Sequence, residues 1–227
     1  MQTKNHNPIF TTLALAVALA GTSILAVADE AKEQETVNAA QRTISEFAAD
    51  PDMTWFRNHV GSARAVFIVP QELKGAFFIG GSGGKGVLLA RDVQTNTWSQ
   101  PAFYGMGAAS FGLQFGGQAA QVVLMAMTEK GVNAFLSTKF QLGAAVSVAA
   151  GPVGAGAQAA TADVLSFSRT KGVFGGVSAE GSVISPLNDA NNAYYGKPVT
   201  AVDILIRHSV SNKGASGLVN TVAKIGK

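Results

Sequence analysis

The pattern of apolar positions predicts that the chain begins with helices. Within residues 30–49, apolar side chains recur every three or four positions, as at Val37 and Ile44, with charged residues between them. Asp50 followed by Pro51 is typical of an N-cap and the first position of a helix. A second, short helix is therefore expected directly after the first.

The pattern then changes to short apolar strands separated by glycine. Ala65–Val69 is predicted to be a buried strand ended by Pro70, and residues 87–90 and 122–127 are predicted strands. Two short helices are predicted at residues 129–137 and 188–195. Residues 199–206 fit either a strand or a helix. Glycine within strands marks bulges, bends or close backbone approach. We therefore predict a single α+β domain with a strongly bent, glycine-rich β-sheet, an N-terminal helix and a few short helices.

A run of uncharged, mostly apolar residues from Ile9 to Ala28 indicates a targeting segment. The run ends in Ala-Val-Ala at 26–28, the small-x-small pattern that signal peptidase cuts, and Asp29 follows. A retained anchor is the alternative, because twenty such residues can span a bilayer. We favour a cleaved signal peptide, which predicts a periplasmic or secreted protein and leaves peripheral attachment to a membrane open.

These patterns divide the chain into a signal peptide, an N-terminal helical segment, an α+β domain and a C-terminal tail. The four parts are residues 1–28, 29–60, 61–208 and 209–227. The tail is polar and rich in small residues, so it is predicted to be flexible.

Composition excludes several classes of protein. Charged residues make up 14% of the chain, against about 25% in typical domains, and the formal net charge is only +3. No basic run is present, which argues against a nucleic-acid partner. Without cysteine there is no disulfide, thiolate metal site or acylated cysteine. His59 and His208 are too isolated for a metal site, and we expect no metal and no cofactor.

Residues 81–86 match two motifs that the predicted secondary structure does not support. Their sequence, G-S-G-G-K-G, fits the dinucleotide fingerprint, but a strand is expected where that motif needs a helix. Gly-x-Ser82-x-Gly also resembles a hydrolase elbow, with Asp203 and His208 later in suitable order. A hydrolase elbow also needs a helix directly after the serine, and a strand is expected there instead. We predict no nucleotide and no enzymatic activity, with a serine hydrolase that uses Ser82 as the remote alternative.

Basic residues beside glycines and aromatic rings are the candidates for a binding surface. Cations next to amphipathic rings suit phospholipid headgroups at a membrane surface. The alternative is that the rings belong to the core and the cations only solubilise the loops. The candidate lipid-contact residues are Lys74, Lys85, Arg91, Trp98, Arg169 and Lys171.

Several sequence blocks between Ala65 and Tyr195 have the same order and spacing as blocks of a known family. They include V-F-I-V-P at 66–70, the glycine loop at 80–86, S-F-G-x-Q-x-G at 110–116, F-S-R-x-K-G-x-F at 167–174 and N-x-Y-Y-G at 192–196. This series resembles the SYLF-domain family of lipid-binding proteins, which is related to yeast actin regulators of the Las17-binding, Ysc84 type.

The resemblance implies a non-enzymatic α+β domain that binds phospholipids. Bacterial relatives are often exported, commonly as lipoproteins, although this chain has no cysteine to acylate. We therefore expect a phospholipid-binding protein of the bacterial cell envelope. The alternative is a structural or protein-interaction domain of the envelope that has a protein partner and no dedicated lipid ligand.

Overall fold

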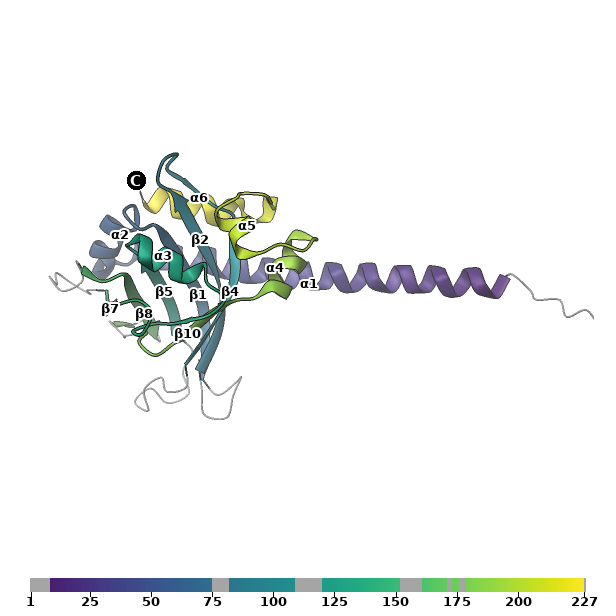
Figure 1. Cartoon of the computed structure of the whole chain (residues 1–227), viewed down its shortest axis with the longest axis horizontal. Coiled ribbons are helices and arrows are strands. Elements are labelled where there is room, and N and C mark those ends of the chain that lie inside the picture. Colours follow the sequence, from purple (N-terminus) through teal and green to yellow (C-terminus); the bar gives the residue numbers. More distant parts are fainter. Residues whose placement is uncertain are drawn as a thin grey trace, which may run out of the picture.

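The computed structural model describes residues 9–74, 82–108, 120–151, 161–170, 173–175 and 179–226. Its helices are α1 (Ile9–Ala49), α2 (Thr54–Val60), α3 (Glu129–Phe135), α4 (Asn188–Tyr195), α5 (Ala201–Leu205) and α6 (Ser216–Ile225), with the 3-10 turns η1 (Pro51–Met53) and η3 (Lys213–Ala215). Its strands are β1 (Ala65–Lys74), β2 (Ser82–Asp92), β3 (Thr97–Trp98), β4 (Ala102–Ala108), β5 (Ala120–Ala126), β6 (Phe140–Gln141), β7 (Val148–Ala150), β8 (Val164–Thr170), β9 (Val173–Gly175) and β10 (Val183–Pro186). Figure 1 shows their arrangement.

The predicted helical start is present as α1 and α2. Val37, Ile44 and Phe47 form a fully buried stripe on α1, as their helical spacing requires. The carboxylate of Asp50 accepts a hydrogen bond from the backbone N–H of Asp52 at 2.9 Å and caps η1, so the chain re-enters a helix after Pro51. α1 also extends, as one helix, well beyond the body of the domain (Figure 1).

The main strands form one curled sheet in the order β6-β10-β4-β2-β1-β5-β8-β7, while β3 pairs with β2 and β9 with β8. Neighbours are antiparallel except β7 and β8. The two ends of this order, β6 and β7, are consecutive in the chain, so the segment 140–150 pairs with β10 at one end and β8 at the other. One short segment therefore covers both ends of the sheet, which limits unpaired strand edges. The predicted α+β domain with a strongly bent sheet is confirmed.

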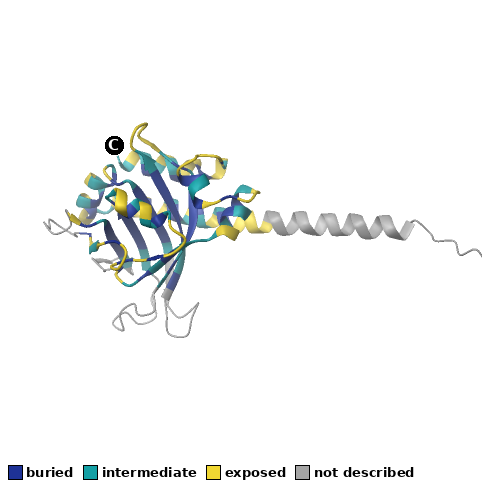
Figure 2. Cartoon of the chain, viewed as in Figure 1, coloured by how far each residue is buried: buried dark blue, intermediate teal, exposed yellow. Residues whose placement is uncertain are grey.

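Both faces of the sheet are buried. Alternate residues such as Val66 and Ile68 pack with α1, α2 and α6, whereas Phe67 packs on the other face with Tyr104 and with Phe135 of α3. Figure 2 shows the buried strands between these two groups of helices. Because neither face meets water, the strands are nearly continuous apolar runs.

The prediction that Pro70 ends the first strand is wrong. β1 continues to Lys74, and the register with both neighbouring strands shifts near the proline, between Ile68 and Gln71 on the β2 side. Proline lacks the N–H that a regular ladder needs, and this irregularity lets the strand continue past it.

The prediction of a flexible tail at residues 209–227 is also wrong, because the structure describes ordered elements up to Gly226. The segment forms η3 and α6, and Leu218 and Val222 are fully buried against the layer that contains α1. Small and polar residues obscure the helical period of this segment in the sequence. Residues 199–206, for which the sequence allowed a strand or a helix, contain helix α5. This helix begins with a capping box between Thr200 and Asp203.

Gly86 in β2 tests how closely the backbones of β1 and β2 approach each other. A Cβ at this position would overlap the carbonyl oxygen of Ile68 in β1. We expect Gly86→Ala to lower the free energy of unfolding, measured with urea, by about 2–3 kcal/mol. Gly105→Ala is the matched control, because its Cβ would meet only the Leu187 side chain at 3.4 Å. Its expected effect is below about 1 kcal/mol, and equal losses in the two variants would contradict this explanation.

Candidate functional site

Lys85, a predicted lipid contact, lies between β2 and α1. Its ammonium group donates hydrogen bonds to the two carboxylate oxygens of Glu33, at 2.8 and 2.6 Å, and lies 6.0 Å from the centre of the Phe103 ring. The Glu33 side chain is 7% exposed and that of Lys85 is 28% exposed. This ion pair joins the first buried turn of α1 after Ala28 to the middle of the sheet.

Arg169 makes a second link between α1 and the sheet. Its guanidinium lies 2.7 Å from the carboxylate of Glu46, and the Gln121 amide donates to the same oxygen at 3.0 Å. Glu33 and Glu46 are thirteen positions apart, which is about 20 Å along a helix. Lys85 and Arg169 therefore do not form one cationic patch.

Arg91 and Trp98 lie where β2 pairs with β3. The Arg91 guanidinium donates to the carbonyl oxygen of Gly61 and to the Asn96 side chain, the latter at 3.3 Å. Trp98 is half-buried and packs against the layer that contains α1 and α6. Both side chains therefore connect the β2–β3 turn to the rest of the domain.

The remaining two candidates are not located by the structure. Lys74 is the last residue of β1, and its side chain lies outside the described residues. Lys171 lies outside them altogether. The four candidates whose side chains are described lie on three different strands and all contribute to packing or pairing within the domain.

The two motif matches at residues 81–86 lack the local structure that their chemistry needs. Ser82 begins β2 and pairs with Ala108 and Lys74, so a strand follows it directly. A nucleotide loop and a hydrolase elbow both need a helix there. The Asp203 carboxylate caps α5 and pairs with Arg207 at 2.7 Å. Hydrogen bonds from Thr200 and Arg207 lower the pKa of Asp203 to about 2.

Asp163 has a structural role at the start of β8. The Thr128 hydroxyl donates to its carboxylate at 2.7 Å, the Ser147 amide and hydroxyl donate at 3.0 and 2.9 Å, and Lys130 lies at 3.2 Å. These partners, Thr128 foremost, hold the pKa of Asp163 well below its usual range. A lowered carboxyl pKa stabilises the fold above the ordinary aspartate pKa, and this contribution is lost as the pH falls toward the native-state value.

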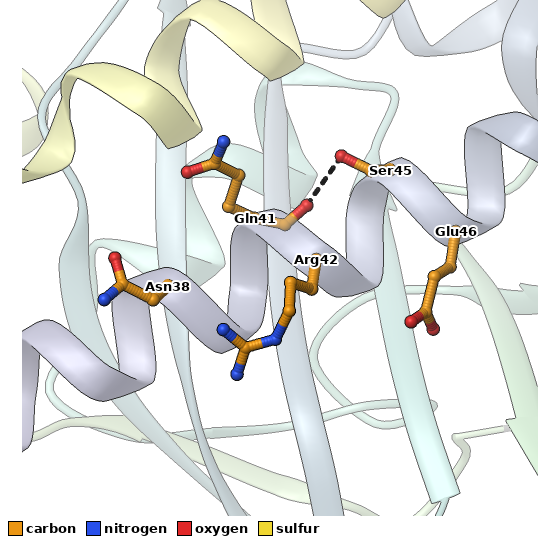
Figure 3. Close-up of a pocket in the computed structure, with 5 residues that line it drawn as sticks. All are labelled: Asn38, Gln41, Arg42, Ser45 and Glu46. Carbon is orange, nitrogen blue, oxygen red and sulfur yellow. Dashed lines mark hydrogen bonds between the residues drawn. The ribbon is translucent and has the colours of Figure 1, made fainter.

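A shallow, open depression runs along the exposed side of α1 and has a volume of about 490 Å³ (Figure 3). Ser45 in this depression donates to the carbonyl of Gln41 at 2.8 Å, and Glu46 is held by Arg169. The Arg42 side chain has no hydrogen-bond or ion-pair partner among the described residues. The lining residues are Asn38, Gln41, Arg42, Ser45 and Glu46.

The described part of the chain offers neither a cluster of metal ligands nor a membrane-spanning helix. No group of three or more His, Cys, Asp or Glu side chains there is placed to hold a metal ion. Among the residues whose side chains the structure describes, no helix is both long and apolar enough to cross a membrane.

Comparison with known proteins identifies the family. The family model described as Ysc84, Las17-binding protein actin regulator, matches residues 107–225, which is more than half of the chain. The chain belongs to the Ysc84 family. The resemblance inferred from the sequence blocks is therefore confirmed. The match includes all of α6, so the predicted domain boundary at residue 208 falls within the Ysc84 match.

The curated relatives of this Ysc84-family chain are longer proteins. LAS seventeen-binding protein 3 of Saccharomyces cerevisiae is 38% identical over 141 residues, which cover 59% of this chain and 30% of the yeast protein. Human SH3 domain-containing YSC84-like protein 1 is 29% identical over 139 residues, covering 59% of this chain and 40% of the human protein. The matched segments thus span about a third of these relatives.

Several exposed cations of the Ysc84-family domain were missed when basic residues near glycine and aromatic rings were chosen as candidates. They lie in residues 196–227, which contain five Lys or Arg against one Asp. That charge count is visible in the sequence, but their exposure depends on how α5 and α6 fold. The exposed members in the described residues are Lys197, Arg207, Lys213 and Lys224.

A double-mutant cycle tests the structural role of Lys85. We expect Glu33→Gln and Lys85→Met each to lower the free energy of unfolding by about 1–3 kcal/mol, less than for a fully buried pair because Lys85 is partly exposed. The double variant should lose less than the sum by at least about 1 kcal/mol. Lys139→Met, at an exposed position, is the control and should change stability by less than about 0.5 kcal/mol. Additive losses would show that the two side chains are not coupled.

Proposed function

We propose that this Ysc84-family chain is a non-enzymatic phospholipid-binding protein of the bacterial cell envelope, which attaches peripherally to a membrane. The observation that carries the proposal is the set of exposed cations on the C-terminal segment, in a domain whose sheet is buried on both faces. With the sheet faces occupied by packing, the outer surface is what a ligand meets. Exposed cations there suit anionic headgroups.

The route to the envelope is part of the same proposal. Residues 28–32 are exposed, and burial along α1 begins at Glu33. Cleavage after Ala28 would therefore fall within an exposed stretch and would leave the Glu33–Lys85 ion pair in place. These observations support a cleaved signal peptide and a periplasmic or secreted location.

The processing step has a direct measurement. We expect mass spectrometry of the protein recovered from the envelope fraction of an expressing bacterium to give Asp29 as its first residue. Ala28→Leu should slow processing, because signal peptidase requires a small residue at that position, while Ala31→Leu, on the exposed stretch beyond the site, serves as the control. A protein that retains Ile9 in the membrane fraction would favour an uncleaved anchor.

A second candidate is a protein-interaction domain of the envelope with no dedicated lipid ligand. LAS seventeen-binding protein 3 is named for binding a protein, and this relative favours the candidate. The open polar depression on α1 is a surface that a protein partner could contact.

Vesicle sedimentation distinguishes the two functions. We expect residues 29–227 to sediment with vesicles that contain phosphatidylglycerol, and to be released as ionic strength rises to about 0.5 M, because salt screens exposed charges. Vesicles of phosphatidylcholine alone are the control. Failure to bind any vesicle at low salt would refute the lipid function, whereas a single saturable protein partner that binds equally at both salt levels would favour the second candidate.

A further inference from the structure

Charge is distributed unevenly between the two ends of the chain. Residues 29–60 contain seven acidic and three basic residues, a formal net charge of −4. Residues 196–227 contain five basic residues and one acidic residue, a formal net charge of +4. Such an asymmetry between segments indicates a charged partner for one of them.

The positive charge of the C-terminal segment is available to solvent. Lys197, Arg207 and Lys213 are exposed. Asp203, the one acidic residue of the segment, is already engaged by Arg207 at 2.7 Å and by the Thr200 hydroxyl at 2.6 Å. Lys213 has no hydrogen-bond or ion-pair partner through its side chain among the described residues. The local excess of cations is therefore not cancelled within the segment.

An exposed aliphatic side chain lies next to these cations. Ile206 is 48% exposed, and among the described residues only Val93 is a large hydrophobic residue of comparable exposure. Ile206 follows α5 directly and precedes Arg207 and His208, which are both exposed. An aliphatic side chain flanked by cations suits the boundary between lipid headgroups and acyl chains.

The same segment lies where α1 leaves the domain. The Asn212 side-chain amide donates to the Glu30 carboxylate at 3.5 Å, and the Gln34 amide donates to the carbonyl oxygen of Gly214 at 3.0 Å. Figure 1 shows α5 and the loop after it at the end of the body from which α1 extends. Before cleavage, the apolar run that starts at Ile9 would therefore hold this end of the domain nearest to the membrane.

We propose that a C-terminal face, formed by the residues around the end of α5 and η3, docks on an anionic phospholipid bilayer. Its cations would contact headgroup phosphates, and Ile206 would enter the interface. This inference rests on the proposed phospholipid-binding function and assigns it to a surface that includes none of the six candidates chosen from sequence. The C-terminal face consists of Lys197, Ile206, Arg207, His208 and Lys213.

Charge reversal on the C-terminal face is the test. The protein is residues 29–227, which retain all described packing from Glu33 onward, and the probe is vesicles of phosphatidylglycerol mixed with phosphatidylcholine. Lys197→Glu and Lys213→Glu should each weaken vesicle partitioning roughly tenfold, because each lysine near an anionic surface contributes severalfold and reversal counts twice. Ile206→Ser should weaken it about threefold or more and reduce the salt-resistant fraction.

Arg42→Glu is the matched control. Arg42 is exposed, its reversal changes the net charge equally, and it lies twelve residues, about 18 Å, further along α1 than Glu30. Arg42→Glu should retain most of the wild-type partitioning, and all variants should keep the wild-type thermal unfolding midpoint.

The possible failures are distinguishable. Wild-type protein that binds no vesicle would refute the proposed function itself. Wild-type binding that Lys197→Glu and Lys213→Glu leave unchanged would overturn the C-terminal face while the lipid function stands. Equal weakening by Arg42→Glu would also overturn it, because overall charge would then explain the binding.

Discussion

Both faces of the curled sheet are buried, and the positions of the helices and of most charged side chains follow from this. A sheet that is apolar on both sides needs a cover on each, and α1 supplies much of the cover on one side through Val37, Ile44 and Phe47. The sheet can curl under this cover because β1 and β2 approach closely at Gly86 and because β1 shifts its register near Pro70. The high glycine content follows in part from this demand on the backbone.

The same constraint determines how the charges are used. Only 14% of the residues are charged, and some of these charges join α1 to the sheet. Lys85 and Arg169, on the sheet, pair with Glu33 and Glu46 on α1. A charge that is committed to a partner within the fold is less available to a ligand. Several cations that remain exposed lie around α5 and α6, next to the exposed Ile206, and the proposed membrane contact is therefore assigned to that segment.

The topology also shows how much of the chain the domain requires. The Ysc84 family match covers residues 107–225 and therefore leaves out β1 and β2. In the sheet, however, these two strands lie between β4 and β5. Without them the strands within the match would lose the centre of their sheet and much of both apolar layers. The folding unit therefore includes the packed part of α1, from Glu33 onward, and the sequence blocks that precede residue 107 belong to the same domain.

Features that depend on a few neighbouring residues could be predicted from the sequence. Helical spacing predicted the packed part of α1, the Asp50–Pro51 pair predicted the restart of the helix, and the short apolar runs predicted the strands that are central to the sheet. These are local signals, because a period or a cap involves residues that are close along the chain. The family, too, could be inferred, since its blocks are read in linear order.

Contacts between side chains that are distant in the sequence became visible only in the folded chain. Lys85 and its partner Glu33 are 52 positions apart, and nothing in either local pattern distinguishes a cation that binds a carboxylate within the fold from one that is free at the surface. The order of α6 was likewise missed, because its stability comes from burying Leu218 and Val222 on a layer built by distant residues. Packing of this kind outweighs weak local propensity, so the C-terminal helix and the surface beside it become visible only once the chain is folded.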